Sequence, residues 1–250
     1  MDLAIAGRTA IVLGATQGIG RGIAGVLDRE GAAVAIAART ALDLERTRSE
    51  LSDRTRAFVA DTDDLDRMAG LVGEVAAKMG PVSILICNTG GPPGGTALEH
   101  PVDEWERAHR SLVLAPRILV EAALPAMREQ QWGRIVNVAA TSVRDPADTL
   151  ALSTIYRLAA LGFLKTLAAQ VGAGGVTVNT VAPGRIATKR LAELMGSMDE
   201  AEQWAAENVP VPRLGTAEEF GELVGFLCSE QAAYITGAVL PIDGGATRAF

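Results

Sequence analysis

Residues 8–20 read RTAIVLGATQGIG, an apolar run followed at once by three glycines, Gly14, Gly18 and Gly20. A helical pattern from Arg21 to Arg29 comes next. The apolar run predicts a buried strand, and the glycines let the backbone turn sharply into the helix. The N–H groups and dipole at a helix N-terminus favour anions, so this turn predicts a pyrophosphate site. Three spaced glycines alone are a weak signal, so the rest of the chain has to decide.

Short apolar runs recur along the whole chain, with segments of helical length and periodicity between them. The seven strand candidates are residues 8–13, 32–38, 56–60, 82–87, 133–139, 175–182 and 237–243. Three helical segments stand out, at residues 65–79, 101–128 and 151–171. This alternation implies right-handed crossovers and a parallel sheet. We therefore expect an α/β fold, a Rossmann-type doubly wound parallel sheet of about seven strands with helices on both faces.

The organisation predicts a single domain over residues 1–250, because no repeat, low-complexity tract or long linker interrupts the alternation. Three irregular stretches, at residues 89–98, 140–150 and 183–212, each follow a predicted strand. Ligands of open parallel sheets bind beyond the carboxyl ends of the strands, so these stretches should form the walls of one site. Residues 185–212, with short helical segments, are expected to form a substrate lid.

Composition excludes several classes of partner. The net charge is −7 without a block of like charge, so we expect no nucleic-acid partner. No run reaches about 18 apolar residues, and the N-terminal stretch lacks the pattern of a signal peptide, which predicts a cytoplasmic protein without a membrane partner.

The cysteines and histidines do not suggest a metal site. Cys87 and Cys228 lie far apart in apolar contexts, which is typical of buried thiols in a reduced compartment. His100 and His109 are the only histidines and belong to no ligand-like cluster. The sequence therefore predicts no bound metal.

Five motifs, in order along the chain, resemble those of the short-chain dehydrogenase/reductase family, and the likeness covers essentially the whole sequence. They are Gly14-x-x-x-Gly18-x-Gly20, Cys87-Asn88-Thr89-Gly90, Pro183-Gly184 followed by Thr188, Tyr234-Ile235-Thr236-Gly237, and Asp243-Gly244-Gly245. Leu13 departs from the pattern, because the family usually has threonine there. The chain resembles a divergent subgroup near the 3-oxoacyl-acyl carrier protein reductases.

The resemblance implies a nicotinamide dinucleotide cofactor. The residues it assigns to cofactor binding are Gly14, Thr16, Gln17, Gly18, Ile19, Gly20, Arg39, Asp61, Thr62, Asn88, Gly90, Arg157, Pro183, Gly184, Ile186 and Thr188. NAD-preferring members carry an acidic residue where Ala38 and Arg39 stand here. A guanidinium can bind a 2′-phosphate, which favours NADP(H) over NAD(H), although Arg39 could instead be a solvated residue at a helix start.

The catalytic positions of the family carry other side chains in this sequence. The stretch GRIVNVAA resembles the family's Gly-Arg-Ile-Val-Asn-Ile-Ser-Ser and implies Ala140 at the catalytic serine position. The stretch GFLKTLA resembles the end of the active-site helix and implies Ser153 and Arg157 at the tyrosine and lysine positions. Leu112 falls at the position of the asparagine that supports a water relay.

A second assignment would use Tyr156 as the acid, with Ser142 or Thr141 as its hydroxyl partner. It lacks the expected spacing, because the residue four positions after Tyr156 is Ala160 and not lysine. Tyr156 lies about 60° around a helix from Ser153, so it could reach the site or serve in packing. The candidate catalytic residues are therefore Ser153, Arg157, Tyr156 and Ser142.

Three functions remain open at this point. The first is an NADP-preferring oxidoreductase that acts on a carbonyl or alcohol. The second is a dinucleotide-binding protein without turnover, and the third is a non-redox isomerase or lyase. The run GGPPGG at residues 90–95 is either the edge of a lid or a surface turn. The resemblance also implies a homo-oligomer, a tetramer built through residues 101–128, residues 151–171 and the C-terminal strand, although the faces of these helices could instead pack on the chain's own sheet.

Overall fold

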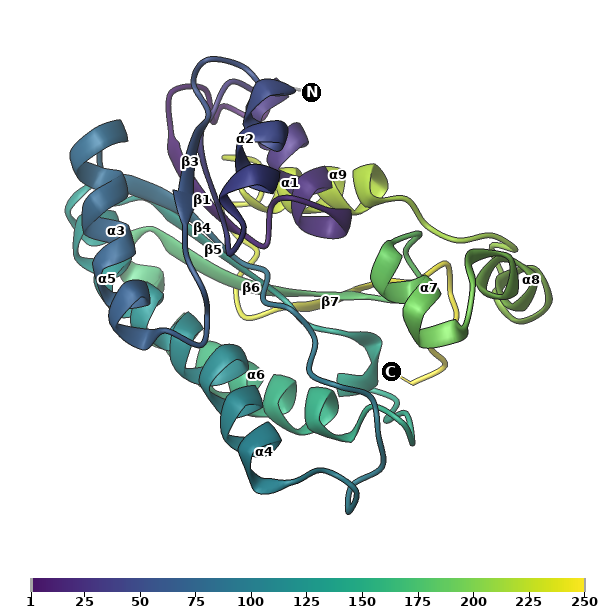
Figure 1. Cartoon of the computed structure of the whole chain (residues 1–250). Coiled ribbons are helices and arrows are strands. Elements are labelled where there is room, and N and C mark those ends of the chain that lie inside the picture. Colours follow the sequence, from purple (N-terminus) through teal and green to yellow (C-terminus); the bar gives the residue numbers. More distant parts are fainter. Residues whose placement is uncertain (1, 250) are drawn as a thin grey trace.

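The fold is a seven-stranded parallel sheet with the strand order β3-β2-β1-β4-β5-β6-β7 (Figure 1). It is seen in a computed structural model that describes residues 2–249. The strands are β1 (Thr9–Leu13), β2 (Ala33–Ala38), β3 (Arg56–Val59), β4 (Val82–Cys87), β5 (Gly133–Val138), β6 (Val176–Pro183) and β7 (Val239–Ile242). The predicted fold class is confirmed, and the strand order reverses between β1 and β4, where open sheets of this kind bind ligands.

Helices cover both faces of the sheet (Figure 1). One layer contains α1 (Gly18–Arg29), α2 (Ala41–Ser49) and α9 (Ala217–Leu227), and the other contains α3 (Leu65–Met79), α5 (Ala115–Glu129) and α6 (Ala151–Val171). Each helix layer encloses a hydrophobic core with its face of the sheet, and alternate residues of β1 point into the two cores. Ile11 packs in the core under α3, α5 and α6, and Val12 packs in the core under α1 and α9. All of β1 is buried, which explains its continuous apolar run.

The long helix predicted over residues 101–128 is divided by a wider turn. It consists of α4 (Val102–His109), a π-helical turn η1 (Arg110–Leu114) and α5, which follow one another without a break. Pro116 is the second residue of α5 and has no N–H to donate to the preceding turn. A widened turn is a common way to accommodate such a residue, and apolar periodicity does not indicate it.

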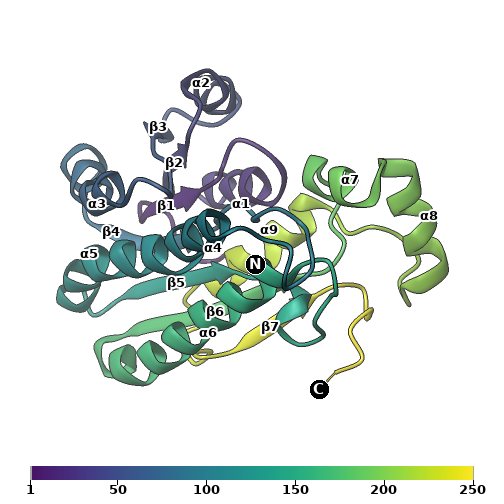
Figure 2. The same cartoon turned by 60° about the horizontal axis from the view of Figure 1, so that its bottom comes forward.

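The stretch at residues 183–212 contains two helices, α7 (Lys189–Met195) and α8 (Met198–Asn208). Figure 2 shows them apart from the helices that cover the sheet, beside the carboxyl ends of the strands. Thr188 and Ser197 cap the two helices, each accepting a hydrogen bond from a backbone N–H of the first turn. Ala201, Ala205, Val209 and Leu214 form a small separate core under α8.

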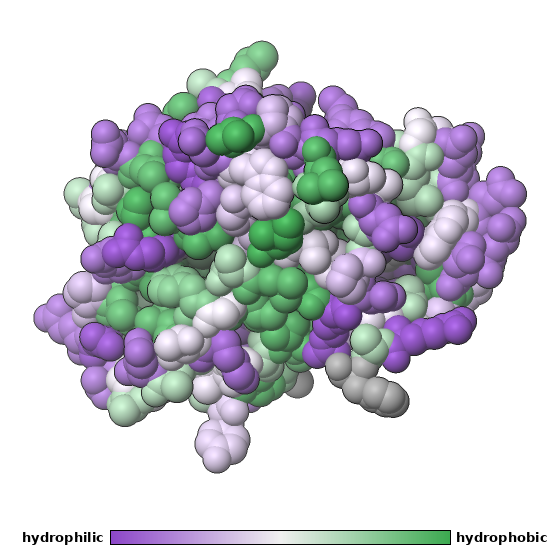
Figure 3. Space-filling model, turned by 90° about the horizontal axis from the view of Figure 1, so that it is seen from below, coloured by the Kyte–Doolittle hydropathy of each residue, from purple (hydrophilic) through white to green (hydrophobic). Residues whose placement is uncertain are grey.

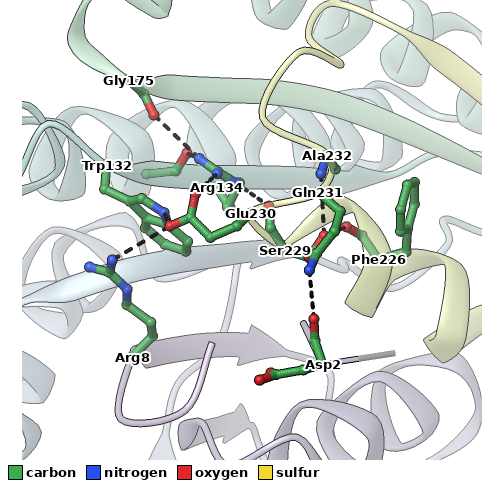
Figure 4. A network of polar contacts seen from close by, with 11 residues as sticks. Asp2, Arg8, Trp132, Arg134, Gly175, Phe226, Ser229, Glu230, Gln231 and Ala232 are labelled. Atoms are coloured by element: carbon green, nitrogen blue, oxygen red, sulfur yellow. Dashed lines mark hydrogen bonds and ion pairs between the residues drawn. The ribbon is translucent and has the colours of Figure 1, made fainter. Parts of the chain in front are cut away.

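A polar network around Arg134 lies at the amino end of β5, on the side of the sheet away from the carboxyl ends of the strands (Figure 4). The Arg134 guanidinium is buried, donates to the backbone oxygens of Ser229 and Gly133, and stacks on Trp132 at 4.3 Å. Glu230 lies 3.7 Å from the same guanidinium and accepts from the Trp132 indole. These contacts connect the amino end of β5 to the segment after α9. The side of the sheet where the strands end, called the carboxyl edge, is the side on which a ligand is expected.

Cys87 and Cys228 are buried free thiols, and burial raises the pKa of each to about 12. Within residues 2–249 no three histidine, cysteine or carboxylate side chains gather where they could hold a metal ion. No helix in the same part of the chain is long and apolar enough to cross a membrane.

Candidate active site

The turn between β1 and α1 leaves no room for side chains at its glycines. Gly14 and Gly18 have φ values of +59° and +52°, in the left-handed region that favours glycine. A Cβ atom on Gly20 would overlap the carbonyl oxygen of Gly14. The glycines therefore let the start of α1 lie directly against the end of β1, with its N–H groups facing the carboxyl edge of the sheet.

Loops from distant parts of the chain meet at this turn. The Asn88 amide, just after β4, donates to the Leu13 carbonyl oxygen at 3.1 Å. A Cβ atom on Gly18 would lie 3.0 Å from the Thr188 methyl group, so the loop after β6 approaches from the other side. The structure thus brings together residues that follow β1, β4 and β6, as the resemblance implies.

A cavity of about 400 Å³ opens beside the glycine turn. Its lining residues are Thr16, Gln17, Gly18, Arg21, Arg46, Glu50, Ala187, Thr188 and Lys189. Arg21, Arg46 and Lys189 supply positive charge there, and Arg21 forms an ion pair with Glu50. These three cations are not among the residues predicted from the sequence, although Arg21 lies one helical turn after Gly18 and its position could be inferred from that spacing.

Arg39 lies at the end of β2 and approaches the loop after β3. Burial and the negative charge of Asp61 raise the pKa of Asp63, while the positive charges of Arg107, Arg110 and Arg39 act in the opposite direction. Arg39 is exposed, and no carboxylate among the described residues lies within ion-pair distance of it. A guanidinium is therefore available beside the Asp61–Thr62 segment.

Ser153 and Arg157 form a buried pair on α6. The Arg157 Nε donates to Ser153 Oγ at 3.1 Å, and its Nη1 donates to the Val138 carbonyl oxygen at 2.6 Å, at the end of β5. Both residues are only 8% exposed. A serine hydroxyl carries one proton, so Ser153 can accept from Arg157 and still donate to a ligand.

Within residues 2–249, Arg157 forms no ion pair with a carboxylate, and its two side-chain hydrogen bonds go to neutral oxygens. Burial, and after it the like charge of Arg190, lower the pKa of Arg157 to about 10. The guanidinium therefore stays protonated at neutral pH. Arg157 thus carries a positive charge at the end of β5 without a carboxylate beside it in the described chain.

The remaining expected catalytic positions are dispersed around this pair. Leu112 is buried in the π turn, and Ala140 is half-buried in extended backbone before the short helix η2 (Thr141–Val143). The Ser142 hydroxyl is buried and has no hydrogen-bond partner within residues 2–249. Such a hydroxyl is available to a ligand or to water.

Tyr156 points to a different neighbour from Arg157. Its ring stacks on His109 at a centroid distance of 5.6 Å and meets Trp105 edge-on at 5.9 Å, both on α4. This contact explains the residue by packing between α4 and α6. Of the two roles that the sequence left open for Tyr156, the observed geometry favours packing.

The glycine- and proline-rich loop at residues 90–95 joins two walls of the site. The Gly95 N–H donates to the Thr149 carbonyl oxygen at 2.8 Å, just before α6. On the other side, Arg190 of α7 donates from Nη2 to the Pro92 carbonyl oxygen at 2.7 Å. The loop is therefore in contact with α7, which favours its interpretation as a lid edge.

Comparisons with known proteins agree with this geometry. Residues 14–247 match the model of a family described as "Enoyl-(Acyl carrier protein) reductase". A 3-oxoacyl-[acyl-carrier-protein] reductase of Haemophilus influenzae is 33% identical over 241 residues, which cover 96% of this chain and 98% of that protein. The chain belongs to the short-chain dehydrogenase/reductase family.

Other members of the family act on quite different small molecules. A cyclohexanol dehydrogenase of a Rhodococcus species is 32% identical over 98% of both chains. The crystal structure of the L-sorbose reductase of Gluconobacter frateurii, complexed with NADPH and L-sorbose, covers the full length of both chains with a TM-score of 0.92 and 28% identity. Members of this family thus share one fold and act on different small molecules.

The glycine turn provides a direct test of the site. We expect Gly20→Ala to weaken NADPH binding by at least about tenfold, because its methyl group forces the turn away from β1. Fluorescence titration with NADPH measures this. Gly25→Ala is the matched control, since nothing lies within 4 Å of its Cβ position, and it should stabilise α1 by about 0.5–1 kcal/mol. Equal NADPH affinity in both variants would contradict the assignment.

Proposed function

We propose that the protein is an NADP(H)-preferring oxidoreductase that acts on a carbonyl or alcohol through the buried Ser153–Arg157 pair. The observation that carries this proposal is the position of the pair, whose donors are fixed at the end of β5 and are shielded from water. Family membership supports the hydride chemistry, since the named relatives are reductases and dehydrogenases.

The residues at the carboxyl edge fit a dinucleotide. The crowded turn at Gly14, Gly18 and Gly20 presents backbone N–H groups, and the cavity beside it carries cations suited to phosphate groups. Arg39 would bind the 2′-phosphate, and Arg157 would use its remaining donors on the ribose. When bound, the nicotinamide ring supplies or takes up a hydride.

Ser153 would act on the substrate oxygen. Its hydroxyl accepts a hydrogen bond from Arg157, so it can itself donate a hydrogen bond to a carbonyl oxygen, and the guanidinium behind it would stabilise negative charge that develops there. Neither group readily transfers a proton at neutral pH. We therefore assign the proton to water or to the substrate, and expect a rate about 10²–10⁴-fold below that of a site with a general acid.

Binding without turnover is the second candidate. The leucine, alanine, serine and arginine at the four expected catalytic positions favour it, because none of them is a conventional acid or base. An assay of NADPH consumption with a broad panel of carbonyl compounds distinguishes the two candidates. The absorbance of the reduced nicotinamide reports the consumption. Binding of NADPH without consumption in the whole panel would exclude the oxidoreductase.

Arg39 should determine the choice between the two cofactors. We expect Arg39→Ala to weaken NADPH binding by about 10–100-fold, as loss of a charge-assisted hydrogen bond does, and to leave NADH binding unchanged. Calorimetric titration with each cofactor measures the effect. An equal loss for both cofactors would show that Arg39 has a structural role instead.

Ser153 should determine turnover without affecting cofactor binding. Removal of one donor to a developing oxyanion costs about 10²-fold in kcat, and we expect this for Ser153→Ala with an unchanged NADPH dissociation constant. Thr154→Val is the matched control, because the Thr154 hydroxyl is equally buried and has no partner in the described chain. If both variants turn over equally, Ser153 does not contact the substrate.

We also propose that copies of the chain associate through α4 and α6. Figure 3 shows the side of the molecule where these helices lie, with apolar surface set among polar residues. Val102, Ile155 and Leu158 are 74%, 38% and 42% exposed there. Light scattering should give a molecular mass that is a multiple of the chain mass. We expect Ile155→Asp to lower this mass, and Leu42→Asp on α2 to leave it unchanged. A monomeric unsubstituted protein would contradict this arrangement.

A further inference from the structure

The lid helices α7 and α8 are joined to the rest of the molecule by few contacts. Among the helices and strands of residues 2–249, α7 is the main neighbour of α8, and Figure 2 shows both apart from the layers that cover the sheet. Their apolar side chains belong to a small core that is separate from the two cores against the sheet. The position of α8 therefore depends on single contacts with loops at the carboxyl edge.

One of these contacts joins Trp204, in the middle of α8, to Arg185. The guanidinium carbon of Arg185 lies 3.4 Å from the centroid of the Trp204 ring, well inside the range of a cation–π contact. Burial lowers the pKa of Arg185, and its Nε is buried without a hydrogen-bond partner within residues 2–249. The side chain is therefore placed by the Trp204 ring and not by a hydrogen bond from Nε. Such a contact is stronger where water is excluded, as it partly is here.

The backbone on either side of Arg185 is fixed to the body of the protein. Arg185 follows Gly184, just after the end of β6, and a Cβ atom on Gly184 would overlap Asp243. The Arg185 carbonyl oxygen accepts from the Gly215 N–H at 3.0 Å. The next side chain, Ile186, is buried in the core under α1 and α9. Arg185 is thus a rigid point from which a side chain reaches α8.

A chain of contacts leads from the lid to the start of α6. Arg190 of α7 donates to the Pro92 carbonyl oxygen at 2.7 Å. In the same loop, the Gly95 carbonyl oxygen accepts at 3.3 Å from the N–H of Ala151, the first residue of α6. Ser153 lies two residues further along this helix. A shift of the lid is therefore passed to the loop at residues 90–95 and to the helix that carries Ser153.

We propose that Arg185 is a positioning residue, whose stack on Trp204 holds α8, and through the lid the loop at residues 90–95, in the place that binds substrate. This proposal rests on the proposed function of the same site. Arg185 acts through Trp204 and not on the reacting atoms. Loss of the stack should therefore weaken substrate binding and leave NADPH affinity unchanged, because the backbone after β6 is fixed by contacts that do not involve the Arg185 side chain.

A second stack of the same kind provides a matched control. Arg8 lies over the Trp132 ring at 4.0 Å, in the network around Arg134 on the other side of the sheet (Figure 4). Arg8→Met removes a cation from an aromatic face, as Arg185→Met does, without touching the lid. Any effect that follows only from Arg185→Met therefore belongs to the lid.

Hydrogen exchange followed by mass spectrometry tests the stack without any substrate. In Arg185→Met, we expect the amides of residues 198–208 to exchange about 5–30-fold faster than in the unsubstituted protein, the range for loss of a partly desolvated cation–π contact. Arg185→Lys keeps a cation at the ring and should keep most of the protection, and Arg8→Met should leave α8 unchanged. Unchanged exchange of α8 in Arg185→Met would overturn the proposal. Trp204→Leu breaks the same contact from α8 and replaces Arg185→Met if that variant does not fold.

Steady-state kinetics tests the positioning role. With the carbonyl compound of the panel that is reduced fastest, we expect Arg185→Met to raise KM about 5–30-fold with kcat and the NADPH dissociation constant unchanged. Arg185→Lys should restore a low KM. The double variant Arg185→Met/Trp204→Leu should be no worse than the more impaired single variant, because both changes break one contact.

The outcomes separate this proposal from the proposed function. A fall in kcat at unchanged KM, or losses that add in the double variant, would overturn the positioning role even if carbonyl compounds are reduced. If no carbonyl compound is reduced, the proposed function fails, whereas faster exchange of α8 in Arg185→Met alone still supports the stack as the contact that holds the lid.

Discussion

A protonated guanidinium held away from water at the end of β5 is the interaction on which the account of this site depends. Arg157 is fixed by the Val138 carbonyl oxygen and by Ser153, and its charge is not balanced by any carboxylate of the described chain. A buried cation without a charged partner is unfavourable. The two hydrogen bonds of Arg157 orient the Ser153 hydroxyl and leave the remaining N–H groups of the guanidinium for a ligand.

In the surrounding fold, the amino ends and the carboxyl ends of the parallel strands lie on opposite sides of the sheet and have different polar groups. At the amino edge, Arg134 is satisfied by backbone oxygens, by Trp132 and by Glu230. At the carboxyl edge, the glycine turn, the loop at residues 90–95 and α7 leave donors and cations available. Two buried arginines, Arg134 in β5 and Arg157 on α6, thus differ, because a carboxylate of the described chain lies beside the first and none lies within ion-pair distance of the second.

Much of the fold could be predicted from the sequence because strand and helix periods are local properties. The helices at residues 65–79 and 151–171 and the strand at residues 82–87 have the predicted bounds. The π turn before Pro116 was missed, since apolar periodicity continues through it. The glycine motif, Arg39 and Asn88 each come directly after a strand, and parallel topology brings the carboxyl ends of these strands to the same side of the sheet.

The site itself was less predictable, because its contacts join distant residues. Nothing in the local sequence indicates that Tyr156 packs on Trp105 and His109, or that Arg190 reaches the loop at residues 90–95. The cations at Arg21, Arg46 and Lys189 come from three elements and become a group only in the folded chain. Whether a charged side chain has a partner is a property of the folded chain and cannot be read from the local sequence.

Calorimetric titration of the cofactor-free protein with NADPH, compared with NADH, tests the central claim most directly. A site built from the glycine turn, Arg39 and the buried Arg157 should bind NADPH at least about tenfold more tightly than NADH, through the charge-assisted contact to the 2′-phosphate. Absence of binding by either cofactor would contradict the account, and would leave the glycine turn as inherited architecture without a ligand.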